Sequence, residues 1–401
     1  MLFLAGRPLG LAPSDQLTAR LCQNAPSSQL GDILSSLSRE DIISAIKLAK
    51  RHDIAHLVCS ELLSGSAFKG NEALERAMNK ELILAHLRCE NLCHELERVC
   101  ACLSDAQIPH IPLKGSVLRS LYPEPWMRSS CDIDVLVPEE LLDKAQDALI
   151  SVLEYEKGER GGHDVAFTSK SGVHVELHFG TVEEGRASDA RSLLMHIWDH
   201  ATPVEQGGYT HRLSDAMFYF YHIAHMAKHF ENGGSGVRPL IDMVILESSP
   251  EADRGKREEL LALGGLEAFE RECMLLAKRW FGSEEAPPSP DTAFTEGLGQ
   301  FILHGGAFGT VENMVTINQS KSGSRAGYVL SRLFMPYSRL KLIYPVLERH
   351  KWLFPFYQVV RWIKVITDKR VGRSVEEMKR SGSVSQRESE NAKMMLERLG
   401  L

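Results

Sequence analysis

The spacing of apolar residues changes twice along this chain. Between residues 71 and 104 the apolar positions Leu82, Leu84, Leu87, Leu92 and Leu96 have helical spacing, which predicts a long helix. After Ile108 the apolar residues fall into short runs separated by Gly, Pro and Ser, as in strands joined by turns. Helical spacing returns from Leu213 onward. We therefore predict an α+β protein. Its three parts are a helical region at 1–105, a small α/β core at 106–205 and a helical region at 206–401.

The α/β core is predicted to alternate strands and helices before it ends in a hairpin. The predicted elements are a strand at 108–114, a turn at Gly115-Ser116, a helix at 117–121, a strand at 130–137, a helix from Pro138 to about Leu153, and strands at 164–168 and 173–179. Pro and two acids at the start of the second helix are typical of a first helical turn.

Two aspartates interrupt the apolar run of the second predicted strand. Asp132 and Asp134 are two residues apart, so both side chains project from the same face of a strand, whereas Ile133 and Val135 point to the other face. Two carboxylates side by side repel each other unless a cation lies between them. The pattern therefore predicts a divalent metal site.

Neighbouring segments add a third acid and a phosphate site. The last predicted strand places His174, Glu176 and His178 on one face. The Gly115-Ser116 turn opens a helix, where backbone N–H groups bind anions, and Lys114 and Ser116 can contact phosphate oxygens. Mg²⁺ prefers carboxylate and phosphate oxygens, so the pattern favours a two-metal phosphoryl or nucleotidyl transfer site.

These motifs together carry a family resemblance. They are Leu113-Lys-Gly-Ser116, Tyr122-Pro123, Arg128, Asp132-Ile-Asp134 and Val175-Glu-Leu-His178. In this order they resemble the DNA polymerase β-like nucleotidyltransferase superfamily, and in particular a poorly characterised bacterial branch of it. The resemblance implies a small α/β core of that fold, flanked by helices. Glu176 stands where the branch usually has Asp, and the gap from Ser116 to Asp132 is slightly longer than usual.

The resemblance also implies roles for individual residues. Gly115 and Ser116 would bind the triphosphate, Asp132 and Asp134 would hold both metal ions, and Glu176 would hold the catalytic one. Lys114 and Arg128 are further candidates for nucleotide binding, although Arg128 is equally well explained as a salt-bridge residue of its loop. His178 either orients Glu176 or contacts substrate.

A second group of polar residues lies on the helix predicted from Ser214 to about Phe230. His222, His225 and His229 occupy positions i, i+3 and i+7 of one face, and Asp242 follows. Three readings stay open: histidines packed on the neighbouring domain, a metal site of the phosphohydrolase type, or the wall of a nucleotide or acceptor cleft. The phosphohydrolase type usually has a His-Asp dipeptide in the cluster, whereas His52-Asp53 and His163-Asp164 lie elsewhere in the sequence.

The third reading has support from the resembled branch, which also has a His-x-x-Lys-His helix followed by Asp. It makes Lys228 and His229 candidates for nucleotide binding. It places His222, His225, Arg238 and Asp242 in the cleft.

The composition of the chain limits where in the cell the protein is expected and which classes of partner it is expected to bind. The net charge of −7 argues against general nucleic-acid binding, and no apolar run reaches the ~20 residues that span a bilayer, so we expect a cytoplasmic protein. The eight cysteines form no Cys-x-x-Cys pair. Cys89, Cys93 and Cys100 fall on one stripe of the predicted helix, and we expect them to be small buried thiols of a helix core rather than a metal or redox site. The segment 321–373 differs, with twelve Lys or Arg, two acids and interleaved aromatic residues. It is either a solvated helical face or a peripheral contact for an anionic membrane or an acidic partner.

The expected reaction is transfer of a nucleoside monophosphate from a nucleoside triphosphate (NTP) to an acceptor hydroxyl or phosphate, with release of pyrophosphate. Mg²⁺ or Mn²⁺ is the expected cofactor, and the acceptor is a small molecule, a glycan intermediate or a protein. The alternatives are a phosphohydrolase that uses His222, His225, His229 and Asp242, and a non-catalytic nucleotide-binding scaffold.

Overall fold

The computed structural model describes residues 39–64, 71–181, 189–282, 291–307, 309–322, 325–367 and 384–401. Residues 1–38 of the predicted N-terminal region and residues 368–373 of the basic segment lie outside this set. The predicted α+β class is confirmed: a small mixed sheet is flanked by helices on both sides in sequence.

Three helices precede the sheet. They are α3 (Arg39–Arg51), α4 (Ala55–Ser64) and α5 (Glu72–Asp105). The long helix α5 begins where predicted, because the Asn71 side chain accepts a hydrogen bond from the Leu74 N–H at 3.3 Å and so caps the first turn. Its buried residues Leu92, Val99 and Leu103 pack in the same hydrophobic cluster as the sheet. Helix α5 therefore covers one sheet face.

The central sheet has five strands in the order β1-β2-β5-β4-β3. The strands are β1 (Ile111–Leu113), β2 (Asp132–Leu136), β3 (Glu156–Arg160), β4 (Asp164–Thr168) and β5 (His174–His178). Only β2 and β5 pair in parallel, and the other three pairings are antiparallel. Strand β3 consists of exposed, mostly charged residues, so it has no apolar alternation by which the sequence could have predicted it.

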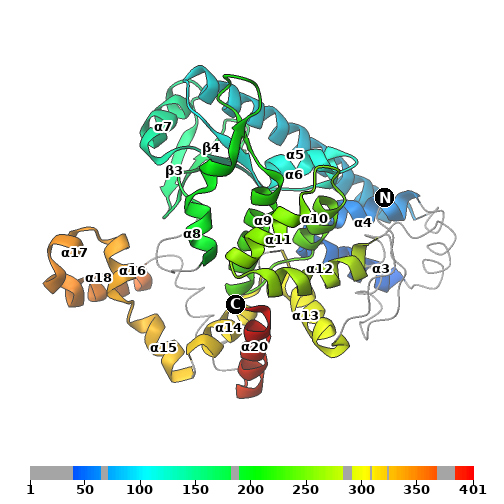
Figure 1. Cartoon of the computed structure of the whole chain (residues 1–401). Coiled ribbons are helices and arrows are strands. Elements are labelled where there is room, and N and C mark those ends of the chain that lie inside the picture. The colour runs from blue at the N-terminus through cyan, green and yellow to red at the C-terminus, as the bar shows by residue number, and fades with distance from the viewer. Residues whose placement is uncertain are drawn as a thin grey trace.

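Short elements connect the strands. They are α6 (Gly115–Leu118), the 3₁₀ turns η2 (Arg119–Leu121), η3 (Pro125–Met127) and η4 (Glu139–Leu141), and helix α7 (Leu142–Ser151). The predicted first strand is thus shorter than expected, and the helix after it already begins at Gly115. Helix α7 lies beside α5 against the sheet (Figure 1). Helix α8 (Asp189–Met195), the 3₁₀ turn η5 (Ile197–His200) and the two-stranded sheet of β6 (Ala201–Pro203) and β7 (His211–Leu213) lead to the C-terminal helices.

The C-terminal helices form the lower part of the molecule in Figure 1. They are α9 (Asp215–Glu231), α10 (Arg238–Glu247), α11 (Arg254–Leu263), α12 (Glu267–Phe281), α13 (Thr292–Gly305), α14 (Val311–Ser322) and α20 (Gln386–Leu399). Ser214 caps α9 by accepting from the Met217 N–H. The chain turns between α9 and α10 at Gly233 and Gly234, whose φ angles of 127° and 126° exclude most other residues.

A further group of helices projects from this body on the left of Figure 1. It consists of α15 (Arg325–Leu333), α16 (Tyr337–Ile343), α17 (Val346–Arg349), the 3₁₀ turn η6 (Lys351–Leu353) and α18 (Phe354–Thr367). We call residues 325–367 the arm and the other described residues the body.

The body is built on two hydrophobic clusters that do not follow the three predicted parts. The first joins residues of α3 and α4 to residues of α9, α10, α12 and α13, and the second joins the sheet to α5 and α7. The residues of α3 and α4, which were predicted to belong to the N-terminal region, thus share their core with the C-terminal helices. None of the described helices combines the length and the apolar character needed to cross a bilayer.

Candidate active site

Two neighbouring parallel strands hold the three predicted acids on one face of the sheet. The register of β2 and β5 sets Asp134 directly opposite Glu176. Because side chains alternate along a strand, Asp132 and Asp134 share a face, whereas Ile133 and Val135 are fully buried on the other side. Residues distant in sequence are thus brought to the spacing of adjacent strands, about 5 Å.

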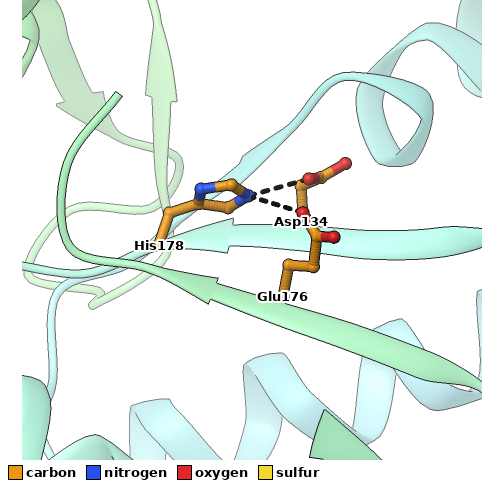
Figure 2. A group of neighbouring side chains, drawn as sticks. All are labelled: Asp134, Glu176 and His178. Carbon is orange, nitrogen blue, oxygen red and sulfur yellow. Dashed lines mark hydrogen bonds and ion pairs between the residues drawn. The ribbon is translucent and has the colours of Figure 1, made fainter. Parts of the chain in front are cut away.

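Asp134, Glu176 and His178 form the tightest polar group of this face (Figure 2). Nε2 of His178 lies 2.8 Å from Oδ1 of Asp134 and 3.3 Å from Oε2 of Glu176. One ligand atom of each residue lies within 4.8 Å of the others, and within the described ranges no other group of His, Cys, Asp or Glu residues meets this distance. The group can hold a metal ion. Asp132 lies at its edge.

Lys114 and His178 fix the charge of Asp134. The buried Asp134 carboxylate accepts from Lys114 Nζ at 2.7 Å as well as from His178, both on Oδ1. Burial alone would raise the pKa of Asp134, but Lys114 and His178 outweigh burial and lower it. Burial would likewise lower the pKa of Lys114 and of His178, yet nearby anionic groups raise both. Asp134 is therefore a carboxylate and Lys114 an ammonium at neutral pH.

Asp132 differs electrostatically from Asp134. Burial, together with repulsion from Asp134, raises the pKa of Asp132 to about 6. When ionised, Asp132, Asp134 and Glu176 carry three negative charges, and Lys114 with a protonated His178 supplies two positive ones. The group thus keeps a negative charge and is rich in carboxylate oxygens, the ligands that Mg²⁺ prefers. The residues present fit the predicted Mg²⁺ or Mn²⁺.

The turn between β1 and α6 brings Lys114 to this group. Lys114 has a φ of 47°, which is uncommon for a residue with a side chain and costs on the order of 1–3 kcal/mol. Gly115 follows in a crowded place, where a Cβ would come within 2.9 Å of the Ser130 Cβ. The Ser116 hydroxyl is buried and has no hydrogen-bond partner, and α6 has only four residues. Phosphate binding by Ser116 therefore stays a prediction.

A cavity of about 380 Å³ lies in front of the acids. Its walls come from the sheet on one side and from α9 and α10 on the other. The predicted site residues that line it are Lys114, Gly115, Arg128, Asp132, Asp134, Glu176, His178, His222, His225, Lys228, His229, Arg238 and Asp242. Of the predicted set, only Ser116 is not in the wall.

The histidines of α9 do not gather around a metal position of their own. His225 and His229 face each other with 3.1 Å between their Nε2 atoms, whereas Nε2 of His222 lies 3.2 Å from the Pro239 carbonyl oxygen. Burial lowers the pKa of His222 and His225, so both are neutral at physiological pH. The Asp242 carboxylate accepts hydrogen bonds from Arg128 and Tyr122 instead of facing these histidines as a metal ligand would. This arrangement resembles a cleft wall more than a phosphohydrolase centre.

A buried ion pair joins the core to α10 below the cavity. Arg128 donates from Nε to Oδ1 of Asp242 at 2.6 Å and from Nη2 to Oδ2 at 2.8 Å. The Tyr122 hydroxyl donates to Oδ1 of the same carboxylate at 2.7 Å. Arg128 and Asp242 are 7% and 0% exposed. Of the two roles left open for Arg128, the structure shows the salt bridge.

A second ion pair joins α10 to the loop after α3. Arg238 Nη1 lies 2.6 Å from Oδ2 of Asp53, and the Ser129 hydroxyl donates to the same oxygen at 2.9 Å. The Arg238 Nε is buried without a hydrogen-bond partner. Arg238 thus stands in the cavity wall with an unused donor.

Sequence reasoning missed several residues around the cavity. Tyr221 is buried in the wall, and burial together with the carboxylates raises its pKa even though Lys114 opposes this. Its position four residues before His225 on one helix face could have revealed it. His163 and Asp164 also line the cavity, with the His163 and His178 rings 5.6 Å apart. Both His-Asp dipeptides that seemed remote in sequence therefore contribute to the site or its frame.

Comparison with known proteins agrees with this geometry. A family model described as an uncharacterised nucleotidyltransferase matches residues 38–282, more than half of the chain. The matched residues contain the sheet, helices α9 and α10, and every residue of the cavity wall except Ala307. The searches of curated proteins and of solved structures gave no match.

Proposed function

The chain belongs to the uncharacterised nucleotidyltransferase family, and we propose that it transfers a nucleoside monophosphate from an NTP to an acceptor hydroxyl or phosphate, releasing pyrophosphate. The proposal includes the polymerase β-like fold of its core and dependence on Mg²⁺ or Mn²⁺. One observation carries it: Asp132, Asp134 and Glu176 share one face of two adjacent parallel strands, in the wall of the cavity that the Lys114-Gly115 turn also lines.

The residues of the cavity suit a triphosphate and its metal. Asp132, Asp134 and Glu176 would hold Mg²⁺ or Mn²⁺, which when bound neutralises phosphate charge and lowers the pKa of an acceptor hydroxyl. Lys114 keeps its ammonium at neutral pH and lines the cavity, so it can pair with phosphate oxygens there. Arg238 also lines the cavity and can add positive charge for the same purpose.

His178 is a positioning residue in this proposal. Its Nε2 atom contacts one oxygen of Asp134 and one of Glu176, so it fixes the orientation of both carboxylates. Hydrogen-bonded partners of metal ligands typically change metal affinity or activity by about 10–100-fold when they are removed. The neutral His222 and His225 line the opposite wall without adding positive charge, which leaves charge pairing to Lys114, Lys228 and Arg238.

A labelling screen tests the proposal. The purified 401-residue chain with Mg²⁺ or Mn²⁺ is given each of the four α-labelled NTPs together with a cell lysate, and transfer of label to any lysate component is measured. We expect one NTP to label an acceptor, and the label to be lost in Asp134→Asn and in Glu176→Gln. The matched controls are Asp147→Asn on α7 and Glu156→Gln on β3, which remove the same groups from exposed positions.

The screen also separates the alternatives. Nucleotide binding without transfer in every lysate would indicate a non-catalytic scaffold. Release of inorganic phosphate that survives Asp134→Asn but not His225→Ala would indicate a hydrolase on α9. Either result would overturn the transferase proposal.

A further inference from the structure

The arm exposes an unusual amount of apolar surface. Nine of the nineteen large apolar residues that are exposed in the described structure fall between residues 330 and 363. They are Leu330, Leu333, Phe334, Ile343, Val346, Trp352, Phe356, Val359 and Ile363. The most exposed is Trp352, at 76%. Single exposed apolar residues are ordinary on a protein surface, but a concentration of them marks a contact surface.

These residues form stripes on the helices. Phe356, Val359 and Ile363 occupy positions i, i+3 and i+7 of α18, so they share one face of that helix. Leu330, Leu333 and Phe334 stand in a similar relation at the end of α15. The apolar side of α18 thus points to solvent, the reverse of what a helix in a closed core shows.

The exposed stripes do not result from a loosely packed arm, because the arm has an interior of its own. Leu340 and Leu347 are fully buried, and the Trp362 Nε1–H donates to the Leu333 carbonyl oxygen at 2.7 Å. The Tyr337 hydroxyl donates to the Leu347 carbonyl oxygen at 2.6 Å. These contacts hold α15, α16, α17 and α18 together, so the stripes are part of an ordered surface.

Positive charge accompanies the apolar residues. Residues 325–367 contain eight Lys or Arg and one acid, within a chain whose net charge is −7. Arg349 and Lys351 are exposed just before Trp352, and Lys364 is exposed beside Ile363. Cationic and apolar side chains therefore alternate over the same short stretch of surface.

We propose that the arm docks on the surface of a bilayer that contains anionic lipids. Within a few ångströms of depth such a surface offers phosphate and carboxylate groups for Lys and Arg, an interfacial layer for Trp, and acyl chains for Phe, Val and Ile. An acidic protein surface would satisfy the cations but would leave the stripes of α15 and α18 exposed. The arm lies peripherally on the bilayer, since no described helix spans it.

Vesicle co-sedimentation of the full chain tests this inference. The probe is a vesicle of 70% phosphatidylcholine and 30% phosphatidylserine, compared with one of phosphatidylcholine alone. We expect partition to the anionic vesicles that weakens as NaCl rises from 50 to 500 mM, because salt screens the charges. Each cation near the surface strengthens partition roughly fivefold.

Two double variants separate the charge from the apolar surface. Arg349→Gln with Lys351→Gln should weaken partition about 25-fold, since two charges are removed. Trp352→Ala with Phe356→Ala should also weaken it, and this loss should persist at every salt concentration. The matched controls, Lys80→Gln with Lys144→Gln and Val152→Ala with Met195→Ala, change exposed residues of the body and should bind like the unchanged chain.

Other occupants of the surface give different outcomes. Equal binding to both kinds of vesicle, or no binding to either, overturns the inference. If sedimentation velocity without lipid shows a dimer that the Trp352→Ala, Phe356→Ala variant dissociates, and vesicles are not bound, the surface belongs to a second copy of the chain. Thermal unfolding of each variant shows that a loss of binding is not a loss of fold.

Discussion

The body and the arm of this molecule place charge and apolar surface in opposite ways. In the body, charged groups such as Asp134, Arg128 and Asp242 are buried and paired around a cavity, and apolar residues fill two interior clusters. In the arm, apolar stripes and cations share the outer surface. A buried arrangement of paired charges suits a small charged ligand, because each group has a fixed partner and position. An exposed mixture of cationic and apolar side chains suits a larger binding surface whose groups can rearrange, such as a bilayer.

The family match covers most of the body and none of the arm. It covers residues 38–282, which include every acid of the candidate site, and does not extend to the arm. The proposed reaction and the proposed membrane contact thus lie in different regions of the chain. If this division is correct, each region can be altered without changing the function of the other.

The largest expected effect is that a variant of each region changes the assay of that region and leaves the other assay unchanged. Glu176→Gln should lower label transfer by at least about 100-fold, since it changes a proposed metal ligand, and should leave vesicle binding unchanged. Trp352→Ala with Phe356→Ala should do the reverse. The assays are the α-labelled NTP screen and vesicle co-sedimentation, both on the full chain. A variant of either region that changes both measurements would show that the two regions act together.

The next effect concerns the stability of the body. Arg128→Met leaves the Asp242 carboxylate buried without its ionic partner, which should lower the free energy of unfolding by about 3–5 kcal/mol. Urea unfolding measures this loss. Arg349→Gln in the arm removes a similar charge from an exposed position and should change the free energy by no more than about 0.5 kcal/mol.

The double variant Arg128→Met, Asp242→Leu is the control for the ion pair. It removes both charges and should recover most of the stability. If Arg128→Met alone lowers the free energy of unfolding by less than about 1 kcal/mol, water reaches Asp242. The contrast between buried charges in the body and exposed charges in the arm would then be wrong.

The sequence predicted the parts of the site that depend on local periodicity. The common face of Asp132 and Asp134 follows from the period of a strand, and the common face of His222 and His225 follows from the period of a helix. The parallel pairing of β2 with β5 does not follow in this way, because hydrogen bonds between distant strands leave no mark on local spacing. The same holds for the ion pair between Arg128 and Asp242, which are 114 residues apart in sequence.

The arm also has a feature that local periodicity could not predict. Its charge and its aromatic residues were visible in the sequence, but not whether they share an exposed surface. That depended on which side of α18 packs against α15, as the contact of Trp362 with Leu333 shows. Periodicity predicts that a helix has two faces and does not tell which face is buried.

A pH-dependent loss of stability should arise in the body. Burial lowers the pKa of His52 from its ordinary value of 6.5 to about 4. The unfolded chain therefore binds a proton between these values that the folded chain does not, so stability is complete above pH 6.5 and is lost as the pH falls toward 4. The loss from this residue should approach about 3 kcal/mol, because each tenfold change in proton affinity corresponds to about 1.4 kcal/mol.

Urea unfolding at several pH values from 4 to 7 measures how steeply the free energy of unfolding changes with pH. His52→Gln tests whether this residue causes the change. The variant loses part of the hydrogen bonding to Val237 and Leu303, so it should be less stable at pH 7. The free energy of unfolding of the variant should nevertheless change less with pH, because the His52 imidazole no longer contributes to the change. An unchanged slope would assign the effect to the other buried histidines, of which His222 and His225 lie in the cavity wall.

The smallest expected effect is on stability in the arm, and it compares two tryptophans. Trp280 in α12 is 2% exposed and Trp352 is 76% exposed. Trp280→Ala should lower the free energy of unfolding by about 3–5 kcal/mol, because it opens a cavity in the core. Trp352→Ala should change it by no more than about 0.5 kcal/mol, although the same change is expected to weaken vesicle binding. A tryptophan that contributes nothing to folding and much to binding is the behaviour expected of a docking surface. A loss of several kcal/mol at Trp352 would instead place it in a packed interior, and the surface proposed for the arm would have to be abandoned.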